Sequence, residues 1–112
     1  MPSGSLAERI PKIHLHCHLE GSLRGSTFVE LATKHGVPLR YHPTGDAAES
    51  AVDPADPYRF DDFAEFLYIF AAVSRSLRHP GDYARMASEF VEDALAQGVI
   101  YGELFVSPPV WT

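Results

Sequence analysis

The chain is organised around one stretch near its start, Ile13-His14-Leu15-His16-Cys17-His18-Leu19-Glu20-Gly21-Ser22. In a β-strand successive side chains point to opposite faces, so His14, His16 and His18 are expected to share one face. Side chains two residues apart on that face lie about 6.5 Å apart along the strand, so two imidazoles can reach one metal ion. An acid and a glycine follow at once. The stretch therefore predicts a strand that ends in a candidate metal site.

The residues on either side of this stretch alternate between strand and helix patterns. Apolar residues recur at helical spacing from 63 to 77 and again from 83 to 95, and residues 99–106 are almost continuously apolar. The expected elements are a flexible lead-in over residues 1–10, a strand over Ile13–His18, a helix from Thr27 to His35-Gly36, a helix over Phe63–Leu77, a helix from Asp82 to Gly98 and a buried strand over Val99–Val106.

The expected helix starts carry capping residues. Thr27 and Glu30 fit the Ser/Thr-x-x-Glu capping pattern of the first helix, Asp61 or Asp62 caps the second, and Asp82 caps the third. Between the first two helices, prolines and Gly45 leave no room for a long regular element over residues 37–58. Such a long connection is either a functional or mobile loop or a tolerated surface insertion.

The order of these elements predicts an α/β fold. Two parallel strands joined by helical crossovers are the opening of an α/β sheet or barrel. Two strands alone do not bury both faces, so the third helix and second strand are expected to pack on elements outside this sequence. We therefore expect residues 1–112 to be the front part of a larger domain.

Composition and charge exclude several classes of protein. The 112 residues carry 9 Lys+Arg against 15 Asp+Glu, a formal charge of -6, which argues against nucleic-acid binding. No apolar stretch approaches the length of a membrane span, and the first residues are too polar for a signal peptide. The single cysteine is typical of a reducing cytoplasm. A cytoplasmic enzyme or binding protein is the expectation.

Three stretches resemble one known family. Residues Pro11–Arg24 are similar to the first-strand signature of the adenosine/adenine deaminase family, which belongs to the metal-dependent amidohydrolases. The aromatic helix segment Phe66–Phe70 and the run from Glu89 through Gly98–Leu104 to Ser107-Pro108 also resemble that family. The likeness covers roughly residues 10–109.

The resemblance implies a zinc enzyme on a (β/α)8 TIM-type barrel that removes the 6-amino group of a purine by hydrolysis. The substrate is then a small-molecule nucleoside or base, with adenosine giving inosine or adenine giving hypoxanthine. His16 and His18 match the family's first-strand metal ligands. His18 and Glu20 match residues near the ribose end of a nucleoside, and Phe66 and Leu67, with Phe70, would cover the base.

Several residues keep alternative interpretations. Many adenosine deaminases have Asp where this chain has Glu20, which makes adenine or another aminopurine a credible substrate; Glu20 alternatively bonds the backbone at Gly21. His14 stands where the family commonly has an acid and receives no role. Cys17 is expected to be a small buried residue, and Glu103 a buried, ion-paired carboxylate of unknown role.

The other residues that the family needs do not appear in this chain. The third histidine ligand, the metal-bound aspartate and the residues that transfer protons are expected beyond Thr112, so the catalytic residues are unknown. His35, His42 and His79 match no later motif. We expect the isolated chain to be an inactive fragment. Two other functions remain open, a His-x-His metallophosphoesterase and a non-catalytic metal-binding or interaction module.

Overall fold

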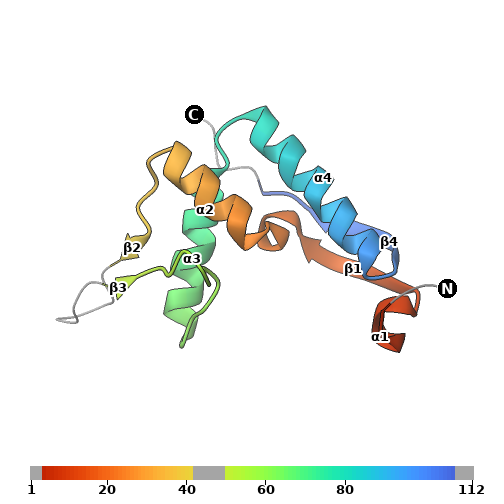
Figure 1. Cartoon of the computed structure of the whole chain (residues 1–112). Helices are drawn as coiled ribbons and strands as arrows, with labels where there is room; N and C mark the ends of the chain where they lie inside the picture. The colour runs from red at the N-terminus through yellow and green to blue at the C-terminus, as the bar shows by residue number, and fades with distance from the viewer. Residues whose placement is uncertain (1–3, 42–49, 108–112) are drawn as a thin grey trace.

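The structure of the chain is a computed structural model that describes residues 4–41 and 50–107. A pair of parallel strands and a group of helices make up this part of the chain (Figure 1). The elements are α1 (Leu6–Arg9), β1 (Lys12–His18), the 3-10 turn η1 (Leu19–Ser22), α2 (Gly25–Lys34), β2 (Arg40–Tyr41), β3 (Ser50–Ala51), α3 (Phe63–Ser76), α4 (Pro80–Ala96) and β4 (Val99–Phe105). The α/β class with two parallel strands and intervening helices is confirmed.

The two long strands, β1 and β4, lie side by side and run in the same direction. Their register is interrupted once within the histidine stretch. His14 pairs with Gly102, whereas Cys17 pairs with Leu104, so β1 has one more residue than β4 between these two pairs. An extra residue of this kind is a β-bulge, and it breaks the alternation of side chains between the two faces.

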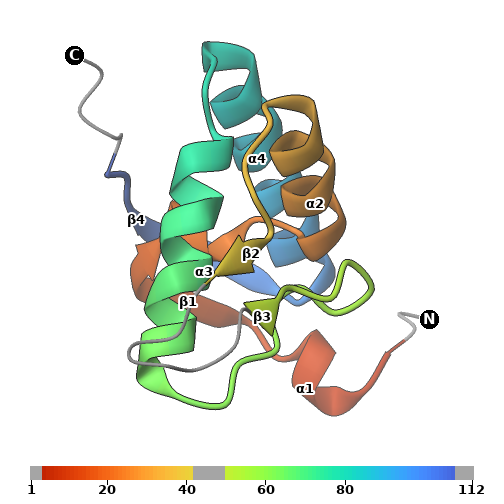
Figure 2. The same ribbon diagram turned by 90° about the vertical axis from the view of Figure 1, so that its left-hand side faces the viewer.

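The hydrophobic core lies among the helices rather than on the strands. Figure 2 shows α2 and α3 side by side in front of α4, and η1 packs against both α3 and α4. The buried apolar side chains come mainly from these elements and are Leu19, Leu23, Phe28, Leu31, Ala32, Val37, Val52, Ile69, Ala72, Val73, Leu77 and Met86. This core fixes η1, and with it the position at which β1 ends.

The expectation that the last strand is buried is wrong for the described part of the chain. Only Val99 of β4 is buried, while Ile100 is 72% exposed. On β1, Leu15 is 59% exposed. Two strands cover little of each other's faces, and among the described residues few side chains pack over them. The apolar stripe of α3 is divided in the same way: Val73 is buried and Phe63 is 71% exposed.

The start of α2 differs from the expected capping pattern. The helix begins at Gly25 with Arg24 as its N-cap, so Thr27 lies inside the first turn. The Thr27 side chain is 1% exposed and donates to the carboxylate of Glu89 on α4. The Thr27 hydroxyl therefore bonds to Glu89 on another helix instead of capping the start of α2. The helix stops at His35 as predicted, and Gly36 follows with φ +68°.

The helix α3 begins where the sequence predicted, whereas α4 begins earlier than predicted. Asp62 caps α3 by accepting the backbone N–H of Glu65, as predicted. By contrast, α4 begins at Pro80, before Asp82, because proline is favoured in the first turn of a helix. The Asp82 carboxylate then accepts the backbone N–H groups of Arg78 and of His79, the N-cap residue of α4.

Two stretches expected to be irregular contain short elements. Within the lead-in, Leu6–Arg9 forms one helical turn that Ser5 caps. In the long connection, β2 and β3 form a two-residue antiparallel pair. Residues 42–49 of this connection, including His42, lie outside the described residues.

Candidate functional site

Two of the three histidines meet at the carboxyl end of β1. The Nε2 atoms of His16 and His18 lie 3.1 Å apart, and the ring centroids are separated by 5.0 Å. Both side chains are exposed. Without an ion one ring must donate and the other accept, since neutral imidazole has one N–H and one lone pair. The structure thus brings two potential metal ligands to a single point.

The close contact between ring nitrogens joins His16 and His18, and the ring of His14 makes a different contact. Its ring lies 6.5 Å from the ring of Phe90 on α4. A β-bulge lies between His14 and Cys17, so the regular alternation of one strand does not extend over all three histidines.

The neighbouring strand supplies an aromatic surface for the histidine pair. The ring of Phe105 at the end of β4 stacks on His16 at 4.3 Å and on His18 at 5.5 Å between centroids. This contact restricts how the imidazoles turn. Sequence reasoning missed it because it depends on the register of β4 against β1.

Glu20 is the most deeply buried acidic residue of the site. Its side chain comes from η1, directly after β1, and the residue is 1% exposed. Its Oε1 accepts the backbone N–H of Ser107 at 2.6 Å, rather than the N–H of Gly21 considered from the sequence. Its Oε2 is buried and has no hydrogen-bond partner among residues 4–41 and 50–107. Such an orphaned acceptor in a folded protein needs an explanation.

An open groove of about 770 Å³ runs along β1 and past the histidine pair. It brings together strand residues and aromatic residues of α3 that are far apart in the sequence. Its lining residues are Ile13, His14, Leu15, His16, Cys17, His18, Gly21, Ser22, Phe66, Leu67, Phe70 and Ser107. The predicted pair Phe66 and Leu67 therefore faces the same space as His16 and His18.

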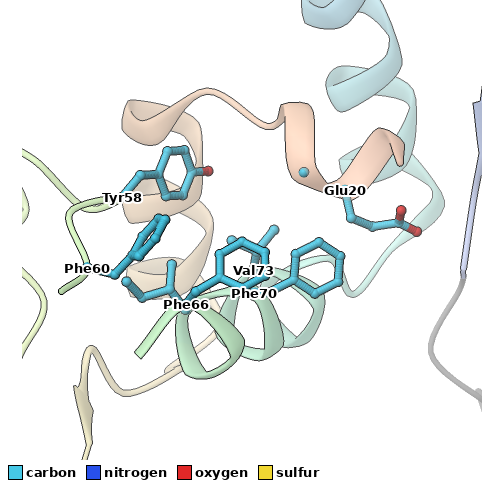
Figure 3. A pocket seen from close by; sticks show the side chains of 8 residues that line it. Glu20, Tyr58, Phe60, Phe66, Phe70 and Val73 are labelled. Atoms are coloured by element: carbon cyan, nitrogen blue, oxygen red, sulfur yellow. The ribbon is translucent and has the colours of Figure 1, made fainter. Parts of the chain in front are cut away.

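A smaller apolar pocket of about 200 Å³ adjoins the groove and shares Gly21, Phe66 and Phe70 with it. Figure 3 shows the rings of Tyr58, Phe60, Phe66 and Phe70 gathered there, with the Glu20 carboxylate pointing away from them. The first two of these residues come from a proline-rich connection without helical periodicity, so the sequence pattern gave no signal for them.

Tyr58 also braces the turn that carries Glu20. Its hydroxyl donates to the carbonyl of Leu23 at 2.6 Å, and its ring stacks on Phe28. Burial raises the pKa of the Tyr58 phenol above its ordinary value, so the hydroxyl keeps its proton and remains a donor.

Of the remaining candidate residues, Cys17 lines the groove and the others lie elsewhere. Glu103 is exposed and accepts from the Tyr101 hydroxyl at 3.1 Å, so the expectation of a buried ion pair is wrong. Cys17 is half-buried in β1. His35 and His79 lie at helix ends, where the Nε2 of His35 is 2.9 Å from Asp82. No group of three or more His, Cys, Asp or Glu side chains suited to a metal ion occurs in the part of the chain that the structure describes.

Comparison with known proteins decides the family. The family model "Adenosine deaminase" matches residues 11–112. The chain belongs to the adenosine deaminase family. It is 37% identical over 99 residues to an adenosine deaminase of Clostridium perfringens, with 88% of this chain and 29% of that protein covered. It is also 38% identical over 102 residues to an adenine deaminase of Paraburkholderia phytofirmans, with 91% and 27% covered.

Family membership places the α/β fold with the beginning of the adenosine deaminase barrel, because the matches cover the N-terminal part of the relatives. The chain spans less than a third of the length of these relatives. These relatives are named as adenosine and adenine deaminases. None of the helices in the described part of the chain is long and apolar enough to cross a membrane.

Proposed function

We propose that residues 1–112 form the first part of the active site of a zinc-dependent deaminase that releases ammonia from a 6-aminopurine. The observation that carries the proposal is the pair His16 and His18, whose Nε2 atoms lie 3.1 Å apart at the end of the strand that leads into the buried Glu20. In the reaction, water adds to C6 of the purine and the C6–N bond breaks. The products are a 6-oxopurine and ammonia.

The histidine pair fits a zinc ion. Two nitrogen ligands at the usual Zn–N length and a tetrahedral angle lie about 3.3 Å apart, close to the observed separation. Zinc, when bound, polarises a water molecule and lowers its pKa toward neutrality. The role of His16 and His18 is to hold the ion at the end of β1, and the stacked Phe105 orients both rings.

Glu20 is proposed to bind the substrate. Its Oε1 is held by the Ser107 N–H, and its Oε2 is left to accept an N–H or O–H of the purine or its sugar. Phe66 and Leu67 give the groove an apolar wall for the base. Glutamate extends one methylene further than the aspartate common in adenosine deaminases, which favours a smaller substrate such as adenine over adenosine.

The lining of the groove favours a purine over a phosphate ester. No lysine or arginine lines the groove in the described part of the chain. A phosphoesterase needs strong donors for its phosphate, so the groove gives that alternative no support.

We further propose that this chain alone does not catalyse the reaction. Zinc sites use three or four protein ligands, whereas the described residues bring two histidines together. The other ligands and the residues that transfer protons are proposed to come from the remaining part of the barrel, of which residues 1–112 form the opening.

A chimeric enzyme tests this function. This chain replaces the corresponding N-terminal segment of the Clostridium perfringens adenosine deaminase, to which it is 37% identical. The chimera is expected to release ammonia from adenine or adenosine, and the same chimera with His16→Ala is expected to release none. A control chimera with Arg59→Lys, an exposed residue outside the groove, should keep its activity. The proposal fails if a folded, zinc-loaded chimera releases ammonia from neither compound.

A further inference from the structure

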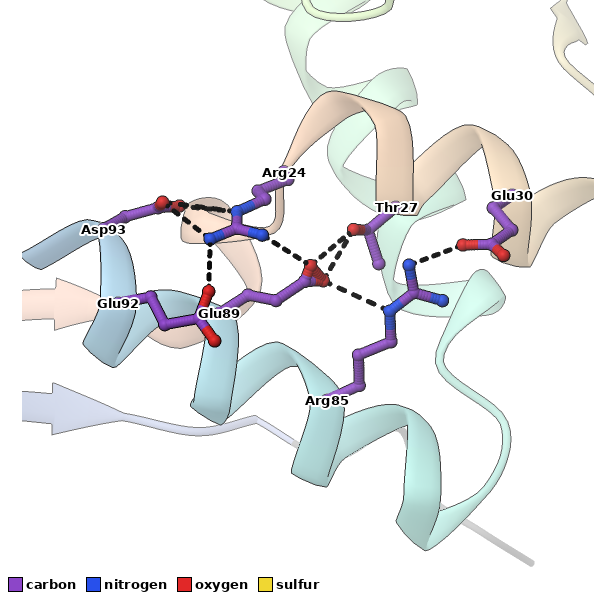
Figure 4. A network of polar contacts seen from close by, with 7 residues as sticks. All are labelled: Arg24, Thr27, Glu30, Arg85, Glu89, Glu92 and Asp93. Atoms are coloured by element: carbon purple, nitrogen blue, oxygen red, sulfur yellow. Dashed lines mark hydrogen bonds and ion pairs between the residues drawn. The ribbon is translucent and has the colours of Figure 1, made fainter.

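An ion-pair network outside the groove joins the turn after β1 to α4 (Figure 4). Its centre is Arg24, whose guanidinium contacts three carboxylates. Nε and Nη2 lie 3.0 and 2.9 Å from the two oxygens of Asp93, Nη2 also lies 2.9 Å from Glu92, and Nη1 lies 3.3 Å from Glu89. The forked contact with Asp93 fixes the direction as well as the distance of the pair.

Glu89 ties the same network to α2. Its carboxylate accepts the buried Thr27 hydroxyl at 2.6 Å and also lies 3.3 Å from Arg85. The Glu89 side chain is 12% exposed, whereas that of Glu92 is 64% exposed. The network therefore has a buried, directional part at Glu89 and an exposed part at Glu92.

Together with the Ser107–Glu20 hydrogen bond, the network connects Glu20 to α4 and β4. Arg24 follows η1, the turn that carries Glu20, and its partners lie on the last turns of α4. From α4 the chain passes through Gly98 into β4, and Ser107 after β4 donates its N–H back to the Glu20 carboxylate. The backbone of Glu20 is thus held to α4 through Arg24, and its carboxylate is held to the strand that α4 precedes.

We propose that Arg24, acting with Asp93 and Glu89, is a positioning residue that sets the Glu20 carboxylate relative to the His16–His18 pair. The inference rests on the proposed function only in naming Glu20 as a substrate-binding residue. A guanidinium fork holds η1 at one distance and angle from α4, which a flexible ammonium does not reproduce. Because these ion pairs are partly exposed, their effect on global stability is small, so positioning and stability are separable.

Amide hydrogen exchange in the purified chain, followed by NMR, tests this role. Arg24→Lys and Asp93→Asn are each expected to speed exchange of the Ser107 amide by about fivefold or more, the factor that corresponds to about 1 kcal/mol. The 13Cδ signal of Glu20 should shift in the same variants. The amide of Leu31 in the core of α2 should exchange at its original rate. Arg59→Lys, an exposed change outside the network, is the matched control.

Two outcomes overturn the inference. If the Ser107 amide and the Glu20 signal are unchanged in both variants, Arg24 does not position Glu20. If Ser107 and Leu31 accelerate equally, the network acts only on global stability. No metal or purine enters the experiment, so its failure leaves the proposed deaminase function intact, and failure of the chimera leaves this result intact.

Discussion

Single side chains at the end of β1 determine what chemistry this chain supports. His16 and His18 converge, Phe105 stacks on both, and the buried Glu20 presents one oxygen without a partner among the described residues. Each of these side chains is held by another group rather than left to rotate. Such restraint matters because binding and catalysis need groups fixed before the ligand arrives.

Tyr58 provides a test of this restraint at one hydroxyl group. Tyr58→Phe removes the bond to the Leu23 carbonyl and leaves that buried acceptor unpaired. We expect the free energy of unfolding in urea to fall by about 1–2 kcal/mol. The matched variant Tyr101→Phe removes an exposed hydroxyl contact with Glu103 and should change it by less than about 0.5 kcal/mol. Equal effects of the two changes would contradict the bracing role.

At this scale the sequence predicted that His16 and His18 would meet better than it predicted their surroundings. The alternation of His16 and His18 is local, so a strand pattern was enough to place them on one face. The bond from Ser107 to Glu20 joins residues 87 positions apart, and no local pattern encodes it. The bulge between His14 and Cys17 was missed because it depends on the partner strand, which the alternation of one strand does not reveal.

The elements of the chain follow their sequence patterns, but their ends are set by tertiary contacts. Both long strands and the three long helices occur where apolar periodicity predicted them. The capping residues were less predictable. Thr27 bonds to Glu89 instead of capping its own helix. Asp82 accepts the backbone N–H groups of Arg78 and His79 and also contacts His35, which follows α2. A propensity for capping is a local preference that a stronger distant partner overrides.

The contacts of Asp82 predict how the free energy of unfolding depends on pH. Although burial by itself raises the pKa of the Asp82 carboxyl, the N–H groups of Arg78 and His79 and the ring of His35 hold it below its ordinary value. A lowered native pKa means that the added stability is present above the unfolded value of about 3.9 and is lost as the pH falls through the lower native value.

We therefore expect Asp82→Asn to lower the free energy of unfolding by about 2 kcal/mol at pH 7. The difference from the unaltered chain should shrink as the pH falls below about 4. Urea titrations from pH 2 to pH 7 measure this difference, with Asp53→Asn as an exposed control. A difference that stays constant, or that grows toward low pH, would contradict the assignment.

The molecule as a whole has a well-packed helical end and an uncovered strand pair. Ile13, Leu15, Ile100, Leu104 and Phe105 are between 42% and 72% exposed, which is a large apolar surface for a soluble chain. The relatives are more than three times as long as the region they share with this chain, since that region is 27–29% of their length. We propose that the rest of such a barrel covers these strands.

This view predicts the behaviour of the isolated chain. Purified residues 1–112 should release no ammonia from adenosine or adenine, because two histidines do not complete a zinc site. They should also self-associate, and Leu104→Lys should reduce concentration-dependent light scattering without lowering the melting temperature. Turnover of either purine by the isolated chain, at a rate that His16→Ala abolishes, would contradict the proposal that the site is incomplete.

The most direct test of the central claim is a zinc titration of the purified chain against a competing chromophoric chelator. His16→Ala and His18→Ala are each expected to weaken zinc binding by about tenfold or more, as loss of one of two ligands requires. His14→Ala, on the same strand but with its ring near Phe90, should bind zinc as the unaltered chain does. Equal binding by all four proteins, or a loss in His14→Ala as large as in His16→Ala, would contradict a metal site formed by His16 and His18.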